Sequence, residues 1–163
     1  MSGERKHIIG LTGGIASGKS AVAACWRALG AAVLDADAVS RSALKTDGAC
    51  YAAVLERFGT DYQTADGSLD RRRLGTLVFS NATARAALNA IVHPYVIDTL
   101  QKATLQCADD PIVWEVPLLI ESGMNEYCGQ VVLVTAPQDT RIQRIMARDG
   151  LDEAEARARV SAQ

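Results

Sequence analysis

The segment Gly13–Ser20 reads Gly-Gly-Ile-Ala-Ser-Gly-Lys-Ser, which satisfies the pattern GxxxxGK[ST]. It follows a short apolar run and precedes a helical pattern, which is the setting in which this motif holds phosphate. Glycines let successive backbone N–H groups face one anion, and the N-terminus of the helix adds partial positive charge. Lys19 can reach the outer phosphates, and the Ser20 hydroxyl can coordinate Mg²⁺. A glycine-rich turn that only packs strand against helix is the alternative. The full motif favours a nucleoside triphosphate site whose candidate ligands are Gly13, Gly14, Ile15, Ala16, Ser17, Gly18, Lys19 and Ser20.

The motif alone does not separate a kinase from a GTPase or a motor, so the acidic residues after the next apolar run matter. That run ends in Asp35-Ala36-Asp37. In a parallel sheet the carboxyl ends of the strands line the ligand crevice, where a carboxylate can orient an acceptor hydroxyl. We assign this role to Asp37 and expect Asp35 to cap the following helix instead. The chain contains no Asn-Lys-x-Asp sequence of the kind that selects guanine, which disfavours a GTPase.

Three arginines near the C-terminus share one face of a predicted helix. Arg141, Arg144 and Arg148 are spaced i, i+3 and i+7, and Ile142 and Ile145 lie on the neighbouring face. By itself the stripe is more typical of a solvated surface. Beside a phosphate loop it favours catalysis, because phosphoryl transfer needs positive groups over the charged oxygens. Arg144, in the middle of the stripe, is the best candidate.

Four short apolar segments are expected to form a parallel sheet. Near-continuous apolar character indicates strands that are covered on both faces. The predicted strands are His7–Thr12, Ala31–Asp35, Ile112–Val116 and Gln130–Thr135. A proline, Pro117, follows the third of them, and Glu121 then lies a few residues beyond the sheet edge, either as a site residue or as a solvent-facing helix cap.

Helical patterns fill the rest of the chain. A helix over Gly18–Leu29 should bury a face made of Val22, Cys25, Trp26 and Leu29. A mostly helical insert of about 75 residues, placed at 38–110, is far longer than an ordinary crossover. Within it, His93 precedes a proline and is expected at a bend. The region 139–163 should hold two helices, the second opened by Asp152 with Glu155 completing a capping box.

Composition limits the classes of function. A chain of 163 residues suits one domain, and a net charge of −2 excludes broad attraction to nucleic acid or to an anionic membrane. No apolar run approaches the roughly 18 residues of a membrane helix. The four cysteines are far apart and form no CxxC pair, so neither a zinc site nor a disulfide framework is indicated. A reducing cytoplasm is the expected location.

Several short motifs, in order along nearly the whole chain, resemble those of the dephospho-CoA kinase family. Except for the phosphate loop each is weak alone, but their common order is specific. They are Leu11-Thr12-Gly13-Gly14-Ile15, Asp35-Ala36-Asp37 with Arg41, Leu69-Asp70-Arg71 with Leu74-Gly75, Leu88-Asn89 with His93-Pro94, Val116-Pro117-Leu118-Leu119 with Glu121, and Arg159-Val160 with Gln163.

The resemblance implies an α/β P-loop kinase fold of the nucleoside-kinase type. Its sheet would have strand order 2-3-1-4-5 and flanking helices, with the insert 38–110 binding the acceptor and the region 139–163 serving as an arginine-bearing lid, all within one domain, 1–163. The implied reaction is transfer of the ATP γ-phosphate to the ribose 3′-hydroxyl of dephospho-CoA, the last step of coenzyme A synthesis. ATP and dephospho-CoA would be the partners, and Mg²⁺ the cofactor.

The resemblance also assigns roles to individual residues. Asp37 would be the acceptor-orienting base, while Lys19 and Arg144 would stabilise the transferring phosphoryl group. Arg148 would join the phosphate loop in binding ATP, with Ser20 on the metal. The substrate-binding residues would be Thr12, Arg41, His93 and Glu121.

This chain departs from the family beyond Gln163, where relatives continue with another strand, an adenine-contacting loop and a final helix. We therefore expect a shortened chain that lacks the last strand, with weakened ATP binding and an exposed edge along 130–135. A P-loop kinase of another small hydroxyl acceptor and an inactive ATP-binding fragment are the alternative functions.

Overall fold

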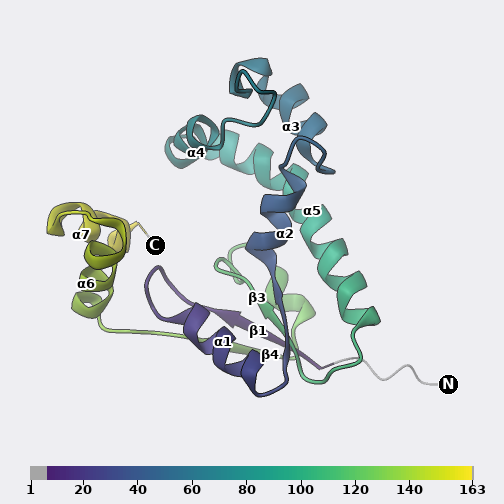
Figure 1. Cartoon of the computed structure of the whole chain (residues 1–163), viewed down its shortest axis with the longest axis vertical. Helices are drawn as coiled ribbons and strands as arrows, with labels where there is room; N and C mark the ends of the chain where they lie inside the picture. Colours follow the sequence, from purple (N-terminus) through teal and green to yellow (C-terminus); the bar gives the residue numbers. More distant parts are fainter. Residues whose placement is uncertain (1–6, 163) are drawn as a thin grey trace. The chain divides into compact units, whose positions relative to one another are not determined.

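The computed structural model describes residues 7–162, which form two compact units (Figure 1). One unit contains the described residues up to Asp35 together with those from Thr104 onward, and the other runs from Ala36 to Ala103. The first unit holds the sheet, and the second is helical. No helix within 7–162 is long and apolar enough to cross a membrane.

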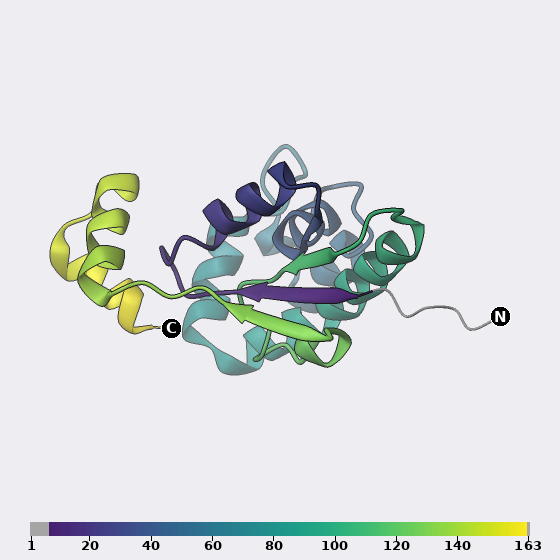
Figure 2. The same cartoon turned by 90° about the horizontal axis from the view of Figure 1, so that it is seen from below.

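The sheet has four parallel strands in the order β2-β3-β1-β4. Figure 2 shows β1 between β3 and β4. The strands are β1 (Ile8–Thr12), β2 (Ala32–Asp35), β3 (Ile112–Glu115) and β4 (Gln130–Leu133). The four predicted strands and their order are confirmed. Because β1 is central, the loop that follows it begins in the middle of the sheet's carboxyl edge.

Helix α1 (Lys19–Ala28) packs on the sheet through Ala23, which is fully buried against Leu11 and Val113, with Val22 and Trp26 beside it. The predicted buried face was partly wrong. Cys25 is exposed, and Leu29 is 80% exposed. Leu29 is the C-cap, where the chain leaves the helix, and the small Ala23 takes the position against the sheet.

The last two helices, α6 (Gln138–Asp149) and α7 (Glu153–Ser161), pack against each other. Their shared core is Ile142, Ile145, Ala156 and Val160, and Ile15 and Ala16 of the phosphate loop pack against it. The predicted capping box at Asp152 is confirmed. The arginine-bearing helix is thereby held against the loop it was expected to serve.

The helical unit contains α2 (Ala36–Ala43), α3 (Tyr51–Phe58), η1 (Thr60–Tyr62), α4 (Arg71–Ser80) and most of α5 (Ala82–Gln106). The short 3-10 helix η2 (Met124–Tyr127) belongs to the sheet unit. Val54, Leu69 and Leu74 form the buried centre of the helical unit. Helix α5 continues through Pro94, so the bend expected at His93 does not interrupt it. Proline removes one backbone hydrogen bond, and the buried side chains of Val92, Val96 and Leu100 keep the flanking turns in place.

Candidate functional site

The loop between β1 and α1 turns back on itself, and this backbone conformation depends on its glycines. The Ser17 amide donates to the Gly14 carbonyl at 3.1 Å, and Gly18 adopts a left-handed φ of 103°. A Cβ at Gly13 would lie 2.6 Å from both Ser17 Oγ and the Val134 carbonyl oxygen, so no side chain fits there. Helix α1 begins directly after this curve. The Ala21 and Val22 amides donate to the Gly18 carbonyl at 3.0 and 3.2 Å, and the amides of Lys19 and Ser20 come before these first helical hydrogen bonds. The loop therefore directs N–H groups and a helix N-terminus at one place, which suits an anion.

A buried carboxylate, Glu115, holds the two functional side chains at the end of this loop. Lys19 Nζ donates to Glu115 Oε1 at 2.8 Å, and Ser20 Oγ donates to the same oxygen at 3.3 Å. Arg27 lies 3.6 Å from Oε2. The Glu115 side chain is only 7% exposed, and a buried carboxylate needs such partners because an unpaired buried charge is costly.

No sequence motif predicts a role for Glu115. Parallel pairing of β1 with β3 sets Leu11 beside Glu115, so this carboxylate ends the strand adjacent to the phosphate loop. The signal was present in the sequence, since Glu115 is an acidic residue within an otherwise apolar strand. A buried carboxylate needs a partner that compensates its charge, and the ammonium of Lys19 is that partner.

Two of the three arginines on α6 contact the phosphate loop. Arg141 Nε donates to the Ile15 carbonyl at 2.9 Å, and Arg144 Nη1 donates to the carbonyls of Ala16 and Ser17 at 3.1 and 3.2 Å. A guanidinium carries several N–H donors, so both groups keep donors for an anion at the loop. Arg148 instead pairs with Asp149 at 2.7 Å, and this hydrogen bond lowers the pKa of Asp149.

Thr12 and Glu121 lie elsewhere in the sheet unit. Thr12 is buried, and its hydroxyl donates to the Pro117 carbonyl at 3.0 Å, which ties the end of β1 to the segment after β3. Glu121 is exposed in the turn that follows that segment. The structure thus brings together the loop, Lys19, Ser20 and Arg144, and leaves Glu121 on the surface.

The remaining candidates lie in the helical unit. Asp37 is in the first turn of α2 and Arg41 in its last turn, so the spacing of four residues sets them on one face. His93 is half-buried in α5, and burial lowers the pKa of its imidazole, which favours the neutral form near pH 7. Asp37 also follows by two residues the end of β2, where Asp35 pairs in register with Glu115.

The oxygen atoms around Ser20 suit a hard cation. The Ser20 hydroxyl and the Glu115 carboxylate are 3.3 Å apart, and oxygen ligands are what Mg²⁺ prefers. Within residues 7–162 no three His, Cys, Asp or Glu side chains gather as a metal cage. Mg²⁺ commonly uses one or two protein oxygens with phosphate oxygens completing its shell, so these residues fit the ion.

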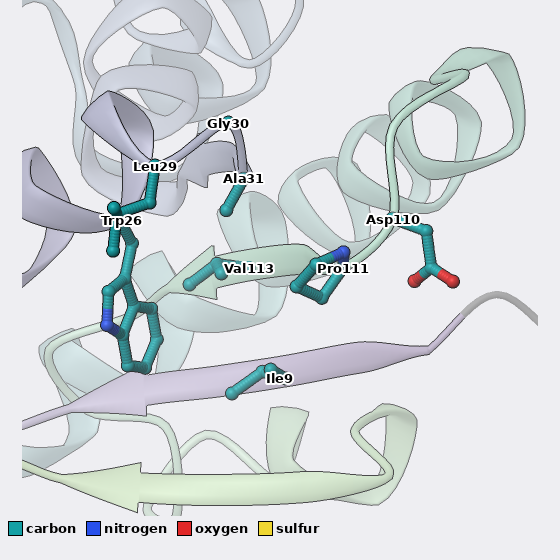
Figure 3. Close-up of a pocket in the computed structure, with 8 residues that line it drawn as sticks. All are labelled: Ile9, Trp26, Leu29, Gly30, Ala31, Asp110, Pro111 and Val113. Carbon is teal, nitrogen blue, oxygen red and sulfur yellow. The ribbon is translucent and has the colours of Figure 1, made fainter.

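A separate cavity of about 230 Å³ lies where the strands begin (Figure 3). Its lining is mostly apolar, and its charged member is the carboxylate of Asp110; the residues are Ile9, Trp26, Leu29, Gly30, Ala31, Asp110, Pro111 and Val113. An apolar lining with a negative charge disfavours phosphate. This cavity is therefore not the anion site.

Comparison with known proteins places the chain among kinases of one kind. The family model described as dephospho-CoA kinase matches residues 7–163. The dephospho-CoA kinase of Geobacillus kaustophilus is 41% identical over 158 residues, covering 95% of this chain and 79% of the relative. That of Anaeromyxobacter dehalogenans is 45% identical over 160 residues, covering 96% and 76%.

Solved structures agree with these matches. The crystal structure of TT1252 from Thermus thermophilus superposes with a TM-score of 0.83 at 40% identity, covering 98% of this chain and 81% of that one. The dephospho-CoA kinase from Campylobacter jejuni superposes with a TM-score of 0.64 at 28% identity, covering 97% and 80%.

Proposed function

The chain belongs to the dephospho-CoA kinase family, and from this premise we propose that it transfers the γ-phosphoryl group of ATP to the ribose 3′-hydroxyl of dephospho-CoA. The observation that carries the proposal is the phosphate loop with Lys19 and Ser20 on the buried carboxylate of Glu115. This reaction is the last step of coenzyme A synthesis. A cytoplasmic location is part of the proposal, and the widely spaced cysteines support it.

Lys19 would neutralise the outer phosphates of ATP. Its ammonium lies 2.8 Å from Glu115 and its flexible stem allows it to turn toward a phosphate bound in the loop. Such a movement would remove one partner from a buried carboxylate. Arg27, 3.6 Å from the other oxygen of Glu115, supplies a second positive charge that partly compensates the ionised carboxylate.

Arg144 would stabilise the transferring phosphoryl group. Hydrogen bonds to the carbonyls of Ala16 and Ser17 fix its guanidinium beside the loop before the reaction starts. Pre-positioned charge of this kind lowers the barrier because little reorganisation is needed as negative charge develops. Arg148 would join ATP binding by leaving its ion pair with Asp149.

Asp37 would accept the hydroxyl proton of the acceptor while the hydroxyl oxygen attacks the γ-phosphorus. The bond from phosphorus to the β–γ bridging oxygen breaks, and ADP leaves with that electron pair. The transition state of such transfers is loose, so orienting the hydroxyl should contribute more than removing its proton. The residues proposed for acceptor binding are Arg41 and His93 in the helical unit and Thr12 and Glu121 in the sheet unit.

The proposal includes Mg²⁺, which Ser20 would hold with Glu115 beside it. When bound, the ion would neutralise negative charge on the phosphates of ATP. The chain's own contribution is to fix the hydroxyl of Ser20 on the buried carboxylate at 3.3 Å.

The direct test is to incubate the protein with ATP, Mg²⁺ and dephospho-CoA and to measure ADP and coenzyme A. We expect equal amounts of both products, and Asp37→Asn should lower kcat roughly 100-fold with little change in the KM for ATP. Asp98→Asn, which alters an exposed carboxylate paired with Lys102, is the matched control. Near-normal turnover of Asp37→Asn would remove Asp37 from the mechanism, and ADP release with other acceptors alone would remove dephospho-CoA.

A further inference from the structure

The helical unit contains a cavity of about 440 Å³ that the proposed phosphate chemistry does not use. Its walls come from two segments, the connection between α2 and α3 and the segment that leads into α4. Two of its lining residues are cationic and one is acidic; the set is Leu44, Lys45, Thr46, Asp47, Ser68, Leu69 and Arg71. Leu69 is buried in the core of the unit, so the cavity has an apolar side and a charged side.

Both walls are held by backbone hydrogen bonds. In the first wall the amide of Gly48 donates to the Lys45 carbonyl at 2.8 Å, and that of Cys50 donates to the Ala43 carbonyl at 3.0 Å. A Cβ at Gly48 would collide with the carbonyl oxygens of Ser42 and Ala43, so this connection needs glycine at position 48. In the second wall the Thr64 amide donates to the Ser68 carbonyl at 2.8 Å. The cavity is therefore formed before any ligand binds, as is usual for ligand sites.

One cation of the cavity is attached to the helix that carries Asp37. Arg71 Nη2 donates to the carbonyl oxygen of Arg41 at 2.8 Å, at the C-terminal end of α2. Arg41 is one turn, about 6 Å, along that helix from Asp37. The proposed acceptor carboxylate and the cationic cavity are thus joined by one short, regular element within a single unit.

We propose that Lys45 and Arg71 bind the 5′-diphosphate of dephospho-CoA in this cavity, an inference that rests on the proposed function. In dephospho-CoA the acceptor hydroxyl and the diphosphate are attached to the same ribose. A carboxylate for the hydroxyl and cations for the diphosphate must therefore lie close together. Helix α2 carries Asp37, ends two residues before Lys45, and accepts the hydrogen bond from Arg71 at the Arg41 carbonyl. The guanidinium fork suits phosphate oxygens, and Lys45 adds a point charge. Asp47 leaves the lining with one net positive charge, which favours an anion.

The proposed subsite should distinguish acceptors that carry a 5′-diphosphate from acceptors that lack one. Adenosine presents the same ribose hydroxyl to Asp37 without a group for Lys45 or Arg71. The chain should therefore prefer dephospho-CoA over adenosine through these two residues, and their loss should reduce that preference.

The test compares Lys45→Ala and Arg71→Ala with matched controls on the same unit. Arg72→Ala removes the neighbouring charge of α4, which is exposed and does not line the cavity, and Lys102→Ala removes an exposed lysine of α5. We measure kcat/KM for dephospho-CoA and for adenosine at saturating ATP, and the Kd of both acceptors by calorimetry. Lys45→Ala is the variant least prone to misfolding, because within residues 7–162 its side chain has no hydrogen bond or ion pair.

Each cavity variant should raise the KM and Kd for dephospho-CoA roughly 10-fold, the loss of about one charge-assisted hydrogen bond, while the values for adenosine and the controls stay unchanged. An equal loss with both acceptors, or an unchanged Kd for dephospho-CoA, would overturn the subsite. Failure of the unaltered protein to form coenzyme A would overturn the proposed function instead. Calorimetric binding of dephospho-CoA would still decide the subsite in that case.

Discussion

The cations of the two units are held in different ways. Near the phosphate loop, Lys19 is only 14% exposed and lies on a carboxylate that is 7% exposed, and Arg141 and Arg144 are bonded to loop carbonyls. In the helical unit, Lys45 and Arg71 are exposed, and Arg71 has one hydrogen bond to a backbone carbonyl. The first arrangement holds positive charge beside the loop before the substrate arrives, which favours stabilisation of the transition state. The second leaves charge accessible on a rigid wall, which is sufficient for binding.

This difference has an energetic consequence. Around Glu115, a change in one partner alters both the charge offered to ATP and the stability of the fold, because a buried carboxylate loses compensation. Around the cavity of the helical unit, a change alters mainly the affinity for an anion, since exposed charges contribute little to stability. Variants can therefore distinguish the two arrangements by measuring activity and unfolding together.

Lys19→Ala should produce the largest effect. Loss of the ammonium should lower kcat/KM on the order of 1000-fold, because an electrostatic donor to the phosphates is removed. The same variant should lower the free energy of unfolding by about 1–3 kcal/mol, since Glu115 loses its nearest charged partner. Steady-state kinetics and urea unfolding measure the two quantities on one protein.

A double variant separates the two effects of Lys19. Lys19→Ala with Glu115→Gln removes the uncompensated charge and should recover much of the stability but none of the activity. If Lys19→Ala alone unfolds at the urea concentration of the unaltered protein, Arg27 and solvent compensate Glu115 fully. The two units would then differ in how their cations are positioned, and not in how much those cations contribute to the free energy of unfolding.

Arg144→Ala should have the next largest effect. Its guanidinium donates to the carbonyls of Ala16 and Ser17. Removal should lower kcat roughly 10- to 100-fold with a smaller change in the KM for ATP, because the interaction strengthens as charge develops. Arg157→Ala, an exposed arginine of α7 paired with Glu153, is the control and should change neither parameter. A rise in KM without a fall in kcat would assign Arg144 to ground-state binding.

The fold and the phosphate loop could be predicted because their signals are local. The motif Gly13–Ser20 has a fixed spacing, and each strand is a short apolar run. The expectation that both faces of every strand are covered was wrong for β4, which is mostly exposed, whereas β3 is buried throughout. The capping box at Asp152 is likewise contained in four residues. Patterns of this kind determine local backbone geometry without knowledge of distant neighbours.

What could not be predicted depends on contacts between distant segments. Glu115 is 96 residues from Lys19 in the sequence, and the two side chains meet only because β3 pairs with β1. Leu29 looked like part of a buried face, but it lies at the end of α1, where the chain turns away. Lys45 has no motif at all, and only the folded connection after α2 sets it in a cavity with Arg71. Periodicity and spacing carry no information on such pairings.

Asp152→Ala should have the smallest effect. This variant tests whether the cap of α7 helps to position the arginines of α6. Asp152 accepts a hydrogen bond from the Glu155 amide at 2.8 Å and caps α7, which packs on the arginine-bearing α6. Loss of the cap should lower the free energy of unfolding by about 1 kcal/mol, whereas Asp152→Asn should retain the cap and the stability. Turnover should stay unchanged in both, because Arg141 and Arg144 are bonded directly to the loop and Ile142 and Ile145 keep α6 buried. A fall in kcat comparable to that of Arg144→Ala would instead mean that α7 positions the arginines, and the set of groups held in place for catalysis would then extend to the cap of the last helix.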